Sequence, residues 1–196
     1  MTRGPRLVLL GKQGAGKGTQ GERAATHFGV QHLSTGQMFR DSASAGVSAG
    51  LDAKGFMDRG ELVPDEIVVA VVDERFANPS EVEPGFVLDG FPRTANQAVE
   101  LDRILGEHAL DIVVDLDVPT DVVVERLEAR AREDDNHDSI RRRLELYEQE
   151  TKPLVDFYRE RGLLVSVDGV GDEDEVQRRL LDAIDAHFDP LATEVR

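Results

Sequence analysis

The glycine-rich segment at residues 11–20 carries the side chains best suited to chemistry. Its sequence, GKQGAGKGTQ, sets Lys17 and Thr19 among several glycines. Glycine lets the backbone curl until several N–H groups point at one spot, and such a nest binds anionic oxygens. A short apolar run at residues 6–10 precedes the segment and a helical pattern follows it, which is the context of a phosphate-binding loop. We therefore expect Lys17 to bring a mobile positive charge to the β- and γ-phosphates of a nucleotide.

One position departs from the common form of such loops. Gly18 follows Lys17, where a Ser or Thr usually supplies a hydroxyl to magnesium. Thr19 comes next and is expected to reach a phosphate instead. The sequence thus predicts magnesium held through water, with no direct protein ligand. A plain strand-to-helix turn is the alternative, and the dense glycines with a lysine at the helix start disfavour it.

Short apolar runs and helical patterns alternate along the chain. Strands are expected at residues 6–10, 29–33, 85–88, 112–116 and 163–167. Helices are expected at residues 16–28, 65–76, 94–105, 121–130 and 139–149. Residues 43–60 combine small side chains with glycines and predict a helical excursion from the sheet. The alternation favours an α/β fold whose parallel sheet is covered on both faces.

Several helix starts carry capping signals. Thr94 and Gln97 have the spacing of a capping box, and so do Ser34 and Gln37. Asp172 precedes the last helical pattern in a similar way. We expect helices to begin at these three places.

The composition excludes several classes of partner and site. The chain has 23 Lys and Arg against 39 Asp and Glu, a net charge of −16, so long contacts with nucleic acid or an anionic membrane are not expected. It contains no cysteine, which excludes disulfides and thiolate zinc sites. No apolar run approaches the roughly 18 residues of a membrane span, and the run at residues 6–10 is too short for a secretory signal. We therefore expect a cytoplasmic protein.

Further motifs narrow the class. GAGKGTQ resembles the phosphate loop of nucleoside monophosphate kinases, and HLSTGQMFR, GELVPDEIV, FVLDGFPRTANQA and REDDNHDSIRRRLELYEQETKPLVDFY resemble adenylate kinase segments in order and spacing. The chain thus resembles the adenylate kinase family, in its short-lid form, over nearly its whole length. The resemblance implies a three-layer P-loop fold with a central five-stranded parallel sheet, a helical AMP-binding excursion and a minimal lid. It also implies one domain, residues 1–196, with a core at 1–33, 64–129 and 137–196, the excursion at 34–63 and a vestigial lid at 130–136.

The resemblance assigns roles to particular residues. The ATP-binding residues would be Gly14, Ala15, Gly16, Lys17, Gly18, Thr19, Arg130 and Gly171. The AMP-binding residues would be Thr35, Arg40, Glu61, Leu62, Val63, Gly90, Phe91, Pro92, Arg93, Gln97, Arg132 and Arg143. The catalytic residues would be Lys17, Arg93, Arg132, Arg143 and Asp89. Asp89 resembles the carboxylate that orients magnesium-bound water, and Gln37 stands where the family usually has an acid.

The implied reaction is reversible transfer of a phosphoryl group from MgATP to AMP, giving two ADP, with no zinc. Such a transfer needs positioned cations rather than a protein nucleophile, and arginine suits it because its planar fork meets phosphate oxygens in pairs. We expect ATP, AMP and ADP as the partners and a monomer as the acting form. A UMP/CMP-type kinase and a nucleotide-binding protein without catalysis are the alternatives. Thr35 and Gln97 favour AMP by resemblance, whereas the shared presence of the predicted catalytic cations favours an enzyme.

Some residues have a second, purely structural interpretation. Gln97 could cap a helix, contact adenine, or do both. Arg130 and Arg132 could form surface ion pairs with the acidic residues that follow them. Asp89 could simply end a strand, although its place at the carboxyl edge of the sheet favours a role in the site.

Overall fold

The computed structural model describes residues 3–130, 132 and 135–188. Five parallel strands form one sheet in the order β2-β3-β1-β4-β5. The strands are β1 (Arg6–Leu10), β2 (Gln31–Ser34), β3 (Phe86–Asp89), β4 (Ile112–Asp117) and β5 (Leu164–Asp168). This confirms the predicted five-stranded parallel sheet, with only small shifts in the strand bounds.

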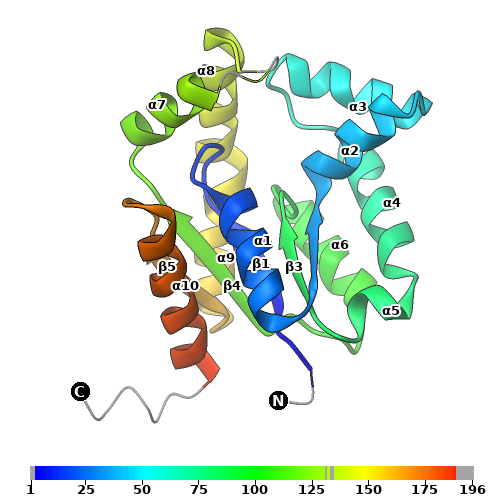
Figure 1. Ribbon diagram of the computed structural model, residues 1–196. Helices are drawn as coiled ribbons and strands as arrows, with labels where there is room; N and C mark the ends of the chain where they lie inside the picture. The colour runs from blue at the N-terminus through cyan, green and yellow to red at the C-terminus, as the bar shows by residue number, and fades with distance from the viewer. Residues whose placement is uncertain (1–2, 131, 133–134, 189–196) are drawn as a thin grey trace.

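Helices cover both faces of the sheet and extend beyond it (Figure 1). They are α1 (Lys17–Phe28), α2 (Thr35–Ser44), α3 (Ser48–Asp58), α4 (Asp65–Phe76), α5 (Pro79–Val82), α6 (Ala95–Leu105), α7 (Thr120–Arg130), α8 (His137–Leu146), the π-helical η1 (Tyr147–Thr151), α9 (Pro153–Glu160) and α10 (Glu173–Phe188). Alternate residues of β1 face opposite sides: Val8 packs with the core under α4, α6 and α9, whereas Leu7 packs with the core under α1, α7 and α10. Because both faces are buried, the strands read as continuous apolar runs.

The predicted excursion is helical, as expected. It consists of α2 and α3, which pack against each other at one end of the sheet (Figure 1). Gly50 permits the contact, since a Cβ there would lie 2.3 Å from the backbone nitrogen of Ala43. On the other side of the same end, the chain passes from α7 to α8 through residues 131–136. The predicted lid therefore falls partly outside the described residues, and the domain bounds stay a prediction.

The capping signals have different outcomes. The Thr94 hydroxyl oxygen accepts a hydrogen bond from the Gln97 N–H at 3.1 Å, which confirms the cap of α6. Asp172 accepts hydrogen bonds from the next helix turn and begins α10 as predicted. The predicted helix start at Ser34 is confirmed, since Ser34 is the last residue of β2 and the N-cap of α2, but its side chain makes no cap hydrogen bond. Gln37 instead binds Arg40 and Asp41 on the following turn of α2.

The predicted helix at residues 139–149 begins and ends differently. It begins at His137, because the side chain of Asn136 accepts a hydrogen bond from the Ser139 N–H at 2.9 Å. At Tyr147 it passes into η1, and the Thr151 hydroxyl at the end of η1 donates to the backbone oxygen of Arg93 at 2.8 Å. Short π-helical segments often occur at functional sites, and both ends of this one line the cavity described below. Across the part of the chain that the structure describes, no helix is both long enough and apolar enough to cross a bilayer.

Candidate active site

A cavity of about 870 Å³ opens at the carboxyl ends of the strands, the edge where open α/β sheets bind ligands. Its volume is in the range of small-molecule sites, roughly 300–1,000 Å³. The predicted site residues that line it are Gly14, Gly16, Lys17, Gly18, Thr19, Arg40, Asp89, Gly90, Pro92, Arg93, Arg130, Arg132 and Arg143. Residues spread over 130 positions of sequence thus share one pocket.

The glycines of the phosphate loop meet a steric requirement. Gly14 and Gly16 have φ values of 90° and 101°, a region that residues with a Cβ rarely adopt. A Cβ on Gly14 would also stand 2.9 Å from the carbonyl oxygen of Val123 and from the Leu127 side chain in α7. The loop therefore lies tightly on α7 and leads into the N-terminus of α1, whose dipole favours an anion.

Lys17 begins α1 and folds back over the loop. Its Nζ donates hydrogen bonds to the backbone oxygens of Gly11 at 2.8 Å and Lys12 at 2.9 Å. Burial lowers the pKa of Lys17 from 10.5 to about 8, although the nearby carboxylate of Asp89 opposes the shift. The ammonium is thus held at the cavity by carbonyl oxygens that a phosphate group can replace.

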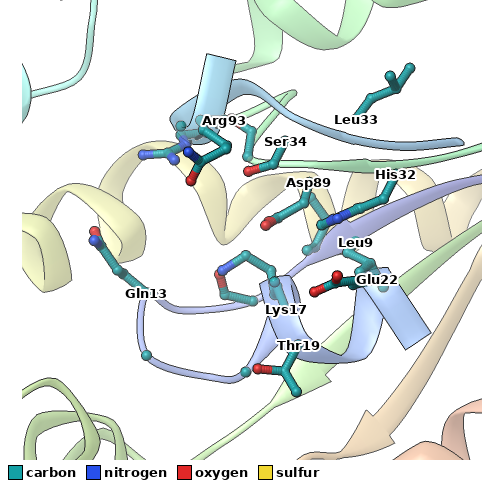
Figure 2. A pocket seen from close by; sticks show the side chains of 18 of the residues that line it. Leu9, Gln13, Lys17, Thr19, Glu22, His32, Leu33, Ser34, Asp89 and Arg93 are labelled. Atoms are coloured by element: carbon teal, nitrogen blue, oxygen red, sulfur yellow. Dashed lines mark hydrogen bonds between the residues drawn. The ribbon is translucent and has the colours of Figure 1, made fainter. Parts of the chain in front are cut away.

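Acidic side chains stand opposite this lysine. Asp89 ends β3, and its Oδ2 lies 3.9 Å from the point where a Cβ on Gly18 would be. Glu22 of α1 and His32 of β2 line the same wall (Figure 2). Burial lowers the pKa of His32 below its ordinary value, because its effect outweighs the opposing charges of Asp89 and Glu22. Among the described residues no group of three or more His, Cys, Asp or Glu side chains could hold a metal ion directly.

Arg93 is fixed at the centre of the site. Its Nε donates to the Gly90 backbone oxygen at 2.8 Å, and its backbone N–H donates to Oε1 of Gln97 at 2.8 Å. Thr151 holds its carbonyl from the other side. The guanidinium is therefore held by Gly90, and the backbone that carries it is held by α6 and η1.

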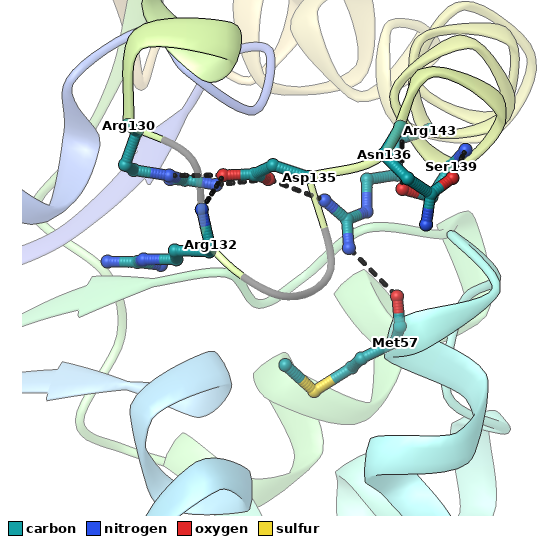
Figure 3. A network of polar contacts seen from close by, with 7 residues as sticks. All are labelled: Met57, Arg130, Arg132, Asp135, Asn136, Ser139 and Arg143. Atoms are coloured by element: carbon teal, nitrogen blue, oxygen red, sulfur yellow. Dashed lines mark hydrogen bonds and ion pairs between the residues drawn. The ribbon is translucent and has the colours of Figure 1, made fainter.

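Arg130 at the end of α7 and Arg143 of α8 both bind one buried carboxylate (Figure 3). The side chain of Asp135 is 0% exposed and binds Arg130 at 2.7 and 2.8 Å, Arg143 at 3.1 Å and the backbone N–H of Arg132 at 3.2 Å. Arg143 also donates to the Met57 backbone oxygen at 2.8 Å, which ties α8 to α3. Burial by itself raises the pKa of Asp135, but the hydrogen bonds and charges of Arg130 and Arg143 outweigh it and the pKa is lowered.

A second, smaller cavity of about 70 Å³ lies between the excursion and the core. The predicted residues that line it are Thr35, Arg40, Glu61, Val63, Gly90, Arg93, Gln97 and Arg143. Phe39, Met57 and Val68 complete it with apolar surface. Arg40, Arg93 and Arg143 line both cavities, so a cationic boundary separates the space at the phosphate loop from the space at Gln97.

Comparison with known proteins agrees with this geometry. A family model described as Adenylate kinase matches residues 9–163. The adenylate kinase of Xylella fastidiosa (strain 9a5c) is 45% identical over 185 residues, which cover 91% of this chain and 98% of that protein. The adenylate kinase of Stenotrophomonas maltophilia (strain K279a) is 46% identical over 187 residues, 92% of this chain and 100% of that protein.

This chain belongs to the adenylate kinase family. The predicted resemblance, the α/β fold class and the enzyme class are thereby confirmed. The individual residue roles stay proposals, because membership of the adenylate kinase family assigns none of them by itself.

Four predicted residues lie outside the walls of both cavities: Ala15, Leu62, Phe91 and Gly171. Phe91 is fully buried in the core, and Ala15 is the buried residue of the phosphate loop that packs against the core. Gly171 has a φ of 129° and lies between β5 and α10, where a Cβ would come within 2.8 Å of Glu175 and Arg179.

Sequence reasoning missed Arg126. Its guanidinium donates to the backbone oxygen of Ala15 at 3.2 Å and of Gly169 at 3.0 Å, and so ties the phosphate loop to the segment after β5. Arg126 lines the larger cavity of this adenylate kinase family member. Its position one helical turn before Arg130 was the available signal, since both then lie on one face of α7.

Proposed function

We propose that this chain catalyses the adenylate kinase reaction, in which the γ-phosphoryl group of ATP passes to AMP and two ADP result, and the reverse. The observation that carries the proposal is the shared boundary of Arg40, Arg93 and Arg143 between two cavities. The larger one has a phosphate loop, and the smaller one has an apolar lining closed by a polar amide. Two nucleotides bound there would meet phosphate end to phosphate end among guanidinium groups.

The proposed roles follow from the charges that develop during transfer. Lys17 exchanges its carbonyl partners for the β- and γ-phosphates of ATP, and the loop N–H groups hold the remaining phosphate oxygens. Arg93, Arg132 and Arg143 stabilise the transferred group, whose negative charge is spread over its equatorial oxygens. Arg130 and Arg126 stand on the ATP side, while Arg40 and Gln97 stand on the AMP side. Since the arginines are positioned in advance, little reorganisation remains for the chemical step.

Magnesium fits the residues present. The carboxylates of Asp89 and Glu22 face the cavity beside Lys17, and both would accept hydrogen bonds from water held by the ion. Bound with ATP, magnesium would neutralise phosphate charge during transfer. We infer that Gln37, which is exposed and neutral, adds no charge to this wall.

A coupled assay of ADP formation from MgATP and AMP tests the proposal. Wild type is expected to form ADP only with both nucleotides, and Lys17→Met should lower kcat by ~10³-fold or more. Lys54→Met is the matched control, because Lys54 pairs with Asp58 on the surface of α3. A panel with UMP and CMP separates the pyrimidine alternative, and nucleotide binding without turnover would reject catalysis.

We infer further that the protein acts in the cytoplasm as a monomer, that its substrates are free nucleotides, and that it binds neither nucleic acid nor membranes. The net charge of −16 supports the last of these inferences, because it opposes association with polyanions. Sedimentation at several protein concentrations tests the monomer: a concentration-dependent mass would contradict it.

A further inference from the structure

The side-chain amide of Gln97 is held in one orientation. Gln97 is 1% exposed, its Oε1 accepts the Arg93 backbone N–H at 2.8 Å, and its Nε2 donates to Oδ1 of Asp65 at 2.6 Å. A backbone N–H can only donate, and a carboxylate can only accept. In the reversed orientation the amide nitrogen would face the Arg93 N–H, which is also a donor. The amide oxygen would face the Asp65 carboxylate, which is also an acceptor.

Asp65 is itself fixed. Its Oδ2 accepts hydrogen bonds from the Thr94 hydroxyl at 3.0 Å and from the Asn96 side-chain amide at 2.9 Å. Thr94 in turn caps α6 through the Gln97 N–H. The first residue of α4 and the first turn of α6 therefore form one frame around the amide, and the two helices pack side by side (Figure 1).

The frame leaves the amide one free lone pair and one free N–H among the contacts of the described residues. An amide oxygen has two lone pairs and an amide nitrogen two hydrogens, and one of each is used by Arg93 and Asp65. Gln97 lines the smaller cavity, whose apolar walls include Phe39 and Val68. A planar base in that cavity would therefore meet one acceptor and one donor, in a fixed order.

That order distinguishes two classes of purine. A 6-aminopurine presents an N–H donor at the exocyclic nitrogen and an acceptor at N1, which match Oε1 and Nε2. A 6-oxopurine presents an acceptor at the exocyclic oxygen and a donor at N1, and would match only the reversed amide. Buried donors and acceptors that lose their partners are costly, so a fixed amide rejects the wrong class.

We propose that Asp65 determines the base specificity of the monophosphate site, by preventing the reversal of Gln97 that a 6-oxopurine would need. The inference rests on the proposed function, because it takes the smaller cavity as the monophosphate site. Asp65 acts through Gln97 and is a positioning residue: it selects the base and takes no part in phosphoryl transfer.

The test compares AMP with inosine 5′-monophosphate as acceptors of the phosphoryl group from MgATP. In Asp65→Asn, residue 65 can donate as well as accept, so the reversed amide becomes tolerable on that side. The ratio of kcat/KM for AMP to kcat/KM for inosine monophosphate is expected to fall about tenfold, because the Arg93 N–H still opposes reversal. Glu66→Gln is the matched control: it removes an exposed acid from the same first turn of α4 and should leave the ratio unchanged.

The outcomes separate this inference from the proposed function. If Asp65→Asn lowers both kcat/KM values equally, Asp65 only stabilises the helix ends and the inference is overturned, while the proposed function stands. If wild type forms no ADP from ATP and AMP, the proposed function fails first.

A second variant keeps the inference testable if Asp65→Asn folds poorly. The pair Asp65→Asn with Gln97→Glu restores a donor opposite an acceptor, because the new amide donates to the new carboxylate. The carboxylate then offers only acceptors to the base, so it can accept from the exocyclic N–H of AMP or from the N1–H of a 6-oxopurine, and the preference of the wild-type amide for AMP is lost. The ratio of AMP to inosine monophosphate should fall below that of wild type, and an unchanged ratio would overturn the inference.

Discussion

The smaller cavity at Gln97 and the cationic rim formed by Arg130, Asp135 and Arg143 hold their functional side chains in different ways. Gln97 is held by a backbone N–H and by a carboxylate from a second helix, both fixed by the core. The rim arginines, Arg130 and Arg143, share the single carboxylate of Asp135, which lies on the short connection itself. Base selection needs an orientation that does not change, whereas a phosphate grip needs cations that are gathered yet able to exchange partners.

The Asp135 network shows how the end of α7 and the start of α8 can present cations side by side. Three arginines that faced one cavity without a counter-ion would repel one another. Asp135 offsets this repulsion in the free protein, and the lowered pKa of its carboxyl keeps it charged. An incoming phosphate offers the same guanidinium groups more oxygens, so the arginines can transfer to it with little movement.

The largest expected effect comes from Arg143→Lys. This variant shows whether residue 143 must bind Asp135 and the Met57 carbonyl at the same time. A lysine cannot donate to Asp135 and to the Met57 carbonyl in the same geometry, nor meet a phosphate in the paired way of a guanidinium. We expect kcat to fall by ~10³-fold. Arg141→Lys is the control, since the Arg141 side chain is exposed and lies 3.7 Å from the exposed Asp138. Equal kcat values for the two variants would refute the role of Arg143.

Asp135→Asn tests the shared carboxylate directly. Loss of a buried partner that two arginines use should cost about 1–3 kcal/mol of unfolding free energy, less than a fully buried pair because Arg130 is 30% exposed. We expect the Tm to fall by roughly 2–10 °C and kcat/KM to fall by about 10- to 100-fold for both nucleotides. Asp138→Asn, at a side chain 92% exposed, should change neither. If only the Tm changed, Asp135 would stabilise the fold alone and would have no part in holding the arginines for phosphate binding.

The binding of ATP at the phosphate loop should depend on pH through Lys17, which extends the comparison to a cation held by backbone carbonyls. With a pKa of about 8, Lys17 loses its charge as the pH rises above that value, and ATP should bind more weakly by up to about tenfold per pH unit. The unfolded chain keeps the ordinary lysine pKa of 10.5 and so binds more protons between pH 8 and 10.5. In that window Lys17 makes the folded state more stable as the pH rises.

Titration calorimetry with ATP at pH 7, 8 and 9 measures the first effect, and denaturant unfolding over pH 8–10 measures the second. Lys17→Met should lack both trends. Parallel pH profiles for wild type and variant would show that Lys17 does not titrate in this range.

The smallest effect is expected from Gln37→Asp, at an exposed position on the cavity wall. One added carboxylate there should stabilise magnesium-bound water by no more than about 1 kcal/mol. The magnesium concentration for half-maximal rate should therefore fall by about two- to fivefold. Asp41→Asn, which removes a charge from the same wall, should shift it the opposite way. An unchanged magnesium requirement in both variants would place the ion away from α2.

Much of the fold followed from local patterns. The run before Gly11 and the one ending at Asp89 are short, apolar and bounded by glycine, and both became central strands. At Ser34 the helix start was predicted correctly, whereas the expected side-chain cap is missing from a residue that also ends β2 and is in register with Asp89 of β3. The π-helical turn at Tyr147–Thr151 carried no local signal, since its contact with Arg93 joins distant segments.

What the sequence determined by itself was the chemistry on offer: a glycine nest with Lys17 at a helix start, and a set of arginines matched by motif. Such features are local, because backbone freedom and residue type act over a few positions. Only the tertiary structure decided that Asp135 would hold Arg130 and Arg143, and that Asp65 would lock Gln97 from 32 residues away. Hydrogen bonds of this kind depend on where two helix ends meet, and that is set by how whole faces pack on the sheet.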